Sequence, residues 1–98
     1  DRHLMEISCT RGEDDTAVPY PMWDFTSSGL NETGMRRVDE PNRFRVGPSL
    51  RTANHGFVRI DWDAPTGPVI RLEGRGGAGE ILMVADVELA SLRPVAVD

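Results

Sequence analysis

The segment 57–63 (FVRIDWD) alternates between apolar and charged residues from Val58 onward, and this alternation constrains the fold more than any other feature of the chain. Val58, Ile60 and Trp62 share one face of the segment, whereas charged residues occupy the other face. A period of two is typical of a half-buried β-strand. We therefore expect Val58, Ile60 and Trp62 to face a hydrophobic core.

Two further strands are predicted after this one, over 68–73 and 80–89, and the segments 64–67 and 74–79 connect the three strands as a turn and a loop. Their inward residues are expected to be Ile70, Leu72, Ile81, Met83, Ala85, Val87 and Leu89. Three successive strands joined by short connections predict an antiparallel meander.

The rest of the chain is less regular. Strands are predicted over 3–8 and 22–30, with an acidic, proline-containing loop over 10–21 between them. The segment 31–56 has no clean period of either kind, so we interpret it as a long irregular segment. The predicted fold class is therefore mostly β, an antiparallel meander with long irregular loops.

Composition limits the size of the protein and its possible partners. The chain has 98 residues, which suits at most one small domain, and its formal net charge is −5. An acidic chain is a poor match for nucleic acids or anionic membranes, and no apolar run is long enough to cross a membrane. Cys9 is the only cysteine, so an internal disulfide is excluded, and we interpret Cys9 as a small buried side chain.

Gly74, Gly76 and Gly79 match the G-x-G-x-x-G fingerprint of dinucleotide-binding proteins. That fingerprint requires a helix after the glycines, because the amides at the helix N-terminus hold the pyrophosphate. The segment 80–89 alternates like a strand instead, so a hairpin loop is predicted and nucleotide binding is not. His55 is interpreted as a loop histidine without a catalytic role.

Asp1 and His3 stand two residues apart before the first predicted strand. A carboxylate and an imidazole form a ligand set that suits zinc, iron or manganese. Two residues by themselves are weak evidence, and a chance pair is the more common explanation of such a spacing.

Five short motifs follow one another along the chain, the first at its start and the last ending at residue 93. They are DRHLMEIS (1–8), PMWDFTSSGL (21–30), PNRFRVG (41–47), NHGFVRIDWD (54–63) and VELASLR (87–93). In this order they resemble segments of the alkaline phosphatase D (PhoD-like) metallophosphatase family, whose first motif reads Ser-Gly-Asp-x-His-x-x-Glu. The Ser-Gly pair is missing before Asp1, and His55 stands where the family usually has phenylalanine.

The resemblance implies that residues 1–98 are the C-terminal part of a phosphatase domain, and therefore an incomplete domain. The family fold is a four-layer αββα metallophosphoesterase sandwich, of which this chain would be a fragment. The resemblance also implies a parent enzyme that is extracellular or periplasmic and that hydrolyses phosphate esters, as alkaline phosphatase or phosphodiesterase, through a dinuclear metal site.

By the same resemblance, Asp1 and His3 are metal ligands, and Glu6 and Asn54 support the ligands or the structure. The ions would be divalent or trivalent, from the set Ca, Fe, Zn and Mn. The family's N-terminal and central metal ligands have no counterpart in this sequence, so the chain alone is expected to be catalytically inactive.

Two alternatives remain open at this point. The chain could be a stand-alone β-rich binding or interaction module without catalytic activity, which would use the acidic loop 12–16 and exposed edge strands. It could also come from a degenerate family member that retains the structure without the chemistry.

Overall fold

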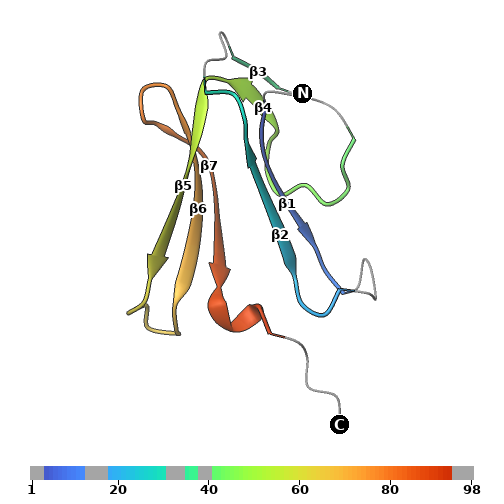
Figure 1. The fold of residues 1–98 in the computed structure, drawn as a ribbon, viewed down its shortest axis with the longest axis vertical. Coiled ribbons are helices and arrows are strands. Elements are labelled where there is room, and N and C mark those ends of the chain that lie inside the picture. The colour runs from blue at the N-terminus through green and yellow to red at the C-terminus, as the bar shows by residue number, and fades with distance from the viewer. Residues whose placement is uncertain (1–3, 13–17, 31–34, 38–40, 94–98) are drawn as a thin grey trace.

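A computed structural model of the chain describes residues 4–12, 18–30, 35–37 and 41–93, which form two small antiparallel sheets (Figure 1). The elements are β1 (Met5–Thr10), β2 (Met22–Ser27), β3 (Met35–Arg37), β4 (Leu50–Thr52), β5 (Asn54–Asp61), β6 (Val69–Gly76), β7 (Ile81–Glu88) and the 3-10 helix η1 (Leu89–Ser91). The strand orders are β2-β1-β4-β3 and β5-β6-β7. The prediction of a mostly β, antiparallel chain is confirmed.

The meander predicted from the alternating residues is the second sheet. β5 pairs with β6 without interruption from Asn54 to Asp61, and β6 pairs with β7 in turn. Gly74 and Gly76 lie within β6, and Gly79 has a φ of 83° in the turn that leads into β7. A left-handed φ of this kind favours glycine. The glycine motif therefore forms a hairpin, as expected, and the following element is a strand rather than a helix.

The hydrophobic core lies between the two sheets. Met5 and Ile7 of β1 pack against four buried residues of β6 and β7, namely Leu72, Met83, Ala85 and Val87. Trp23, Phe25, Leu50, Ile70, Leu82 and Leu92 pack around them and are partly buried. The predicted inward face of β6 and β7 is thus confirmed for these buried residues. It is wrong for Ile81, which is 51% exposed at the start of β7.

The burial predicted for the first strand of the meander is wrong. Val58, Ile60 and Trp62 are 59%, 45% and 65% exposed. Val58 pairs with the core residue Leu72, and paired residues lie on the same face of a sheet. Val58 is therefore on the core-facing side of the sheet, as predicted, although it is not buried. These residues stay exposed because β5 is an edge strand and the buried core cluster lies over β6 and β7.

The interpretation of 31–56 as one irregular segment is also wrong in part, because β3, β4 and the start of β5 lie within it. β3 and β4 have three residues each, which is too short for a periodic pattern to appear in the sequence. The residues that connect β3 to β4 bond to β1: the Cys9 N–H donates to the Phe44 carbonyl (2.8 Å), and the Val46 N–H donates to the Ile7 carbonyl (2.8 Å). This segment therefore runs along the edge of β1.

The predicted strand over 3–8 is found as β1, two residues later in the chain, and the strand over 22–30 ends earlier, at Ser27. Cys9 is buried, as expected. Across the described ranges, no helix has the length and apolar character needed to cross a membrane.

Candidate functional site

Of the four residues to which the resemblance assigns a role, Glu6 and Asn54 are described by the structure. Asp1 and His3 lie outside the described residues. The nearest described residue is Leu4, which is held by β2. Its N–H donates to the Ser28 hydroxyl (3.3 Å), and its carbonyl accepts from the Ser28 N–H (3.1 Å) and hydroxyl (3.3 Å). Ser28 thus fixes the backbone immediately after the predicted ligand pair.

Asn54 connects the two sheets. Its side chain is fully buried, and its Oδ1 accepts a hydrogen bond from the Ser27 hydroxyl (2.6 Å). Its Nδ2 donates to the Thr52 carbonyl (2.7 Å), and its backbone N–H donates to the Gly29 carbonyl (3.1 Å). Every one of these bonds stays within the protein. The role of Asn54 in this structure is therefore to join the end of β2 to the start of β5.

These contacts also explain the serine-rich end of β2. Thr26, Ser27 and Ser28 give this strand end three hydroxyl groups, and such groups can satisfy nearby backbone donors and acceptors. The hydroxyl of Ser28 does this at Leu4, whereas that of Ser27 bonds the Asn54 side chain. The Thr26 hydroxyl donates to Asp24 on the surface (3.0 Å).

Glu6 holds the segment 41–47 against β1. Its Oε1 accepts from Arg45 Nε at 2.6 Å and from Asn42 Nδ2 at 3.1 Å, and Asn42 Nδ2 also donates to the Ser8 hydroxyl (3.0 Å). Both charged side chains are less than one-fifth exposed. Because Arg45 already neutralises the Glu6 carboxylate, the arrangement favours a structural role for Glu6.

A groove of about 380 Å³ opens beside this ion pair. Its lining comprises Leu4, Glu6, Thr26, Pro41, Asn42, Arg45 and Ser49. The Ser49 hydroxyl is buried and has no hydrogen-bond partner among the described residues. Five of the seven lining residues have polar side chains, so the groove is predominantly polar. No set of three or more His, Cys, Asp or Glu side chains that could hold a metal occurs within the described ranges, which do not include Asp1 and His3.

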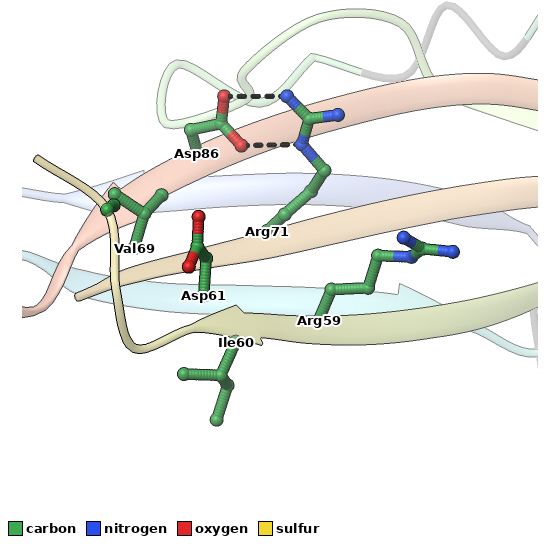
Figure 2. A pocket seen from close by; sticks show the side chains of 7 residues that line it. Arg59, Ile60, Asp61, Val69, Arg71 and Asp86 are labelled. Carbon is green, nitrogen blue, oxygen red and sulfur yellow. Dashed lines mark hydrogen bonds and ion pairs between the residues drawn. The ribbon is translucent and has the colours of Figure 1, made fainter.

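A second groove, of about 540 Å³, lies on the outer face of the second sheet (Figure 2). Arg71 forms a bidentate ion pair with Asp86 there, with Nε–Oδ1 and Nη2–Oδ2 distances of 2.8 and 3.2 Å. The hydrogen bond from Arg71 lowers the pKa of Asp86 below its ordinary value. Arg59 and Asp61 line the same groove. The positive charges of its two arginines equal the negative charges of its two aspartates, so the groove does not favour a ligand of either charge.

Glu73 is a buried carboxylate at the centre of the second sheet. It is 2% exposed, and its Oε1 accepts from Arg75 Nε (3.0 Å) and Nη2 (2.6 Å). The Nε atom of Arg59, on the neighbouring strand β5, lies 3.6 Å from the same carboxylate oxygen. The hydrogen bonds from Arg75 lower the pKa of Glu73 below its ordinary value of 4.5, against the opposing effect of burial. A buried carboxylate paired in this way keeps its charge in the folded protein.

We expect the free energy of unfolding to fall as the pH drops below the ordinary pKa of Glu73. The ionised carboxylate stabilises the fold above the pKa of the unfolded chain, and this contribution is lost as the pH falls through the lower pKa of the folded protein. Urea unfolding between about pH 6 and pH 3 measures the effect. The stability difference between the wild type and Glu73→Gln should shrink toward low pH. Glu88→Gln, on the exposed side of β7, is the control for removing a carboxylate from the second sheet and should change the free energy of unfolding little.

Sequence reasoning missed three residues of these clusters. Asn42 and Arg45 lie in a motif that carries the resemblance, but nothing in the motif itself shows that they contact Glu6. Glu73 did carry a signal, because Arg71 and Arg75 stand two residues away on either side and share its face of the strand.

Comparison of the chain with protein-family models, with curated proteins and with solved structures found no match. The family resemblance therefore stays a prediction.

Proposed function

We propose that this chain is the C-terminal part of a metal-dependent phosphoesterase similar to the PhoD-like enzymes. One observation supports this most directly. Four motifs that carry the resemblance are separated in sequence, yet they contact one another around the start of β1. Leu4 bonds Ser28, Glu6 bonds Asn42, and Ser27 bonds Asn54. A shared structural environment explains why these motifs occur together.

Within this proposal, Asp1 and His3 supply two ligands to the metal centre. Bound there, two metal ions would polarise the phosphoryl oxygens and activate a water molecule for attack on phosphorus. The described residues act by positioning: Ser28 fixes Leu4, directly after the ligand pair, and Arg45 and Asn42 fix Glu6. A carboxylate and an imidazole alone cannot hold two ions, so the isolated chain should not hydrolyse phosphate esters.

The test uses the longer protein that the proposal requires. Its coding sequence should continue upstream of Asp1 with Ser-Gly and with further carboxylate and histidine motifs. The purified protein should hydrolyse p-nitrophenyl phosphate or its diester. Asp1→Ala and His3→Ala should each reduce the bound metal, measured by elemental analysis, and lower the rate at least about 100-fold, the upper end of what losing a residue that merely supports a ligand costs.

The matched control is Asp63→Ala, because Asp63 is an exposed carboxylate after β5. This variant should retain the metal content and rate of the wild type. Unchanged metal content in Asp1→Ala and His3→Ala would contradict the ligand assignment. A full-length protein without activity on any phosphoester would contradict the enzymatic proposal, and robust hydrolysis by the isolated chain would contradict its assignment as a fragment.

A stand-alone binding module is the second candidate, and one observation favours it. β5 is an edge strand, and Phe57, Val58, Ile60 and Trp62 on it and just beyond it are between 45% and 65% exposed. Exposed apolar residues on an edge strand are typical of interaction sites. A start codon immediately upstream of Asp1 would decide for this candidate. The acidic loop predicted over 12–16 lies largely outside the described residues.

A further inference from the structure

The outer edge of β5 has the features of a protein-interaction surface. β5 is eight residues long, and of the strands in the described residues only β6 pairs with it, along one of its two edges. Between Asn54 and Asp61 the strand contains no proline, which would remove a backbone donor, and its two charged residues, Arg59 and Asp61, have opposite signs. This edge is therefore open to a further strand.

The structure identifies the backbone groups that such a strand would meet. The Asn54 N–H donates to Gly29 and therefore points away from β6. Along an uninterrupted antiparallel strand, the backbone N–H and C=O groups of successive residues point alternately toward and away from the partner strand. The groups of Gly56, Val58 and Ile60 therefore also point away from β6. None of these groups has a hydrogen-bond partner among the described residues. The open edge therefore offers three donors and three acceptors, and Asn54 closes one end of it.

We propose that a second copy of this chain pairs with this edge, so that β5 meets β5 in antiparallel orientation around a two-fold axis at Val58. Val58 then lies opposite its own copy, and Gly56 lies opposite Ile60 of the second copy. This register pairs all the open donors and acceptors of both strands. It joins the two three-stranded sheets into one continuous sheet. The proposal does not depend on the proposed function.

The side chains of β5 are complementary to themselves in this register. His55, Phe57, Arg59 and Asp61 share the outer face of the strand, and Figure 2 shows Ile60 pointing away from Arg59 and Asp61. The register places His55 opposite Asp61 of the other copy and Phe57 opposite Arg59. These are a potential ion pair and a cation–π pair, and each occurs twice.

A neighbouring register fits less well. A shift of two residues moves the two-fold axis to Arg59 and places the two Arg59 side chains opposite each other, which is unfavourable. It also leaves Gly56 without a partner from the other strand. On the opposite face, the Val58 register brings the exposed side chains of Val58 and Ile60 of both copies together. The exposed apolar residues that the core leaves uncovered are thereby partly buried in the dimer.

The first test is the mass of the 98-residue chain by sedimentation equilibrium across a range of concentrations. We expect a monomer–dimer equilibrium. Val58→Pro removes the central N–H from both strands, and proline is tolerated in an edge strand where its nitrogen faces solvent. This variant should keep the circular dichroism spectrum of the wild type. Its dimer dissociation constant should rise at least about 10-fold, because two hydrogen bonds are lost.

A pair of cysteine variants tests the register. Residues in a hydrogen-bonded antiparallel pair have Cα atoms about 5.5 Å apart, within the range of a disulfide. Val58→Cys should therefore form a disulfide-linked dimer on mild oxidation. Asp61→Cys should not, because six residues separate its position from that of its copy, about 20 Å along the strands. The buried Cys9 is present in both variants and cannot account for a difference.

A chain that stays monomeric at its highest soluble concentration overturns the proposal. So does a folded Val58→Pro variant with undiminished dimerisation, or equal crosslinking by the two cysteine variants. If Val58→Pro does not fold, sedimentation of the wild type and the cysteine pair still decide the matter.

Discussion

Replacing Gly74 with alanine should lower the free energy of unfolding by about 3 kcal/mol, the upper end of what overpacking a core costs. Gly74 lies in β6, is buried, and faces Met5 of the other sheet across the core. A Cβ atom at this position would collide with Met5 Sδ and lie 2.7 Å from Met83 Cγ. Met5 is completely buried, so its side chain has little space into which it could move. The side chains of Met5 and Met83 would have to shift, which would disturb the packing of the core.

Urea unfolding measures this loss, and Gly77→Ala is the matched control. A Cβ at Gly77 would lie 3.6 Å from the Ala53 Cβ, an ordinary contact, so this variant should stay within about 0.5 kcal/mol of the wild type. Equal stability of the two variants would mean that the sheets do not pack as closely at Gly74 as the structure indicates.

Gly74 also illustrates how far the sequence predicts the fold. Alternation of residue types identified the meander and the inward face of β6 and β7, because a strand displays its environment every second residue. It could not show that Gly74 faces Met5 across the core, since the two lie in different sheets. The same limit explains the error at Val58, Ile60 and Trp62. Periodicity reveals which side of a strand is apolar, but not whether another layer covers that side.

The candidate site shows a similar division. Glu6 and Asn54 were selected through the family resemblance, and both proved to be well-connected polar residues. Their partners were not predictable, because Arg45 lies 39 residues from Glu6 and Ser27 lies 27 residues from Asn54. Such pairings depend on how the strands and loops assemble. Glu73 is the contrasting case, since its partner Arg75 stands two residues away in the same strand and is visible in the sequence itself.

Asn54→Ala should lower the free energy of unfolding by about 2–3 kcal/mol, because it leaves a buried carbonyl without its donor. The Thr52 carbonyl loses the Asn54 Nδ2 hydrogen bond, and the Ser27 hydroxyl loses its acceptor. The backbone bond from Asn54 to Gly29 does not depend on the side chain and should persist. The expected result is a weakened junction between β2 and β5 in a chain that still folds.

A double-mutant cycle with Ser27→Ala isolates the side-chain bond between the sheets. Ser27 is exposed apart from this contact, so Ser27→Ala alone should cost about 1 kcal/mol. The double variant should be more stable than the sum of the two single losses predicts, with a coupling of about 1 kcal/mol. Strict additivity would show that the Ser27–Asn54 bond does not stabilise the junction. In the longer protein, loss of stability with unchanged metal content would make Asn54 a structural residue, whereas loss of metal at full stability would assign it to the support of the ligands.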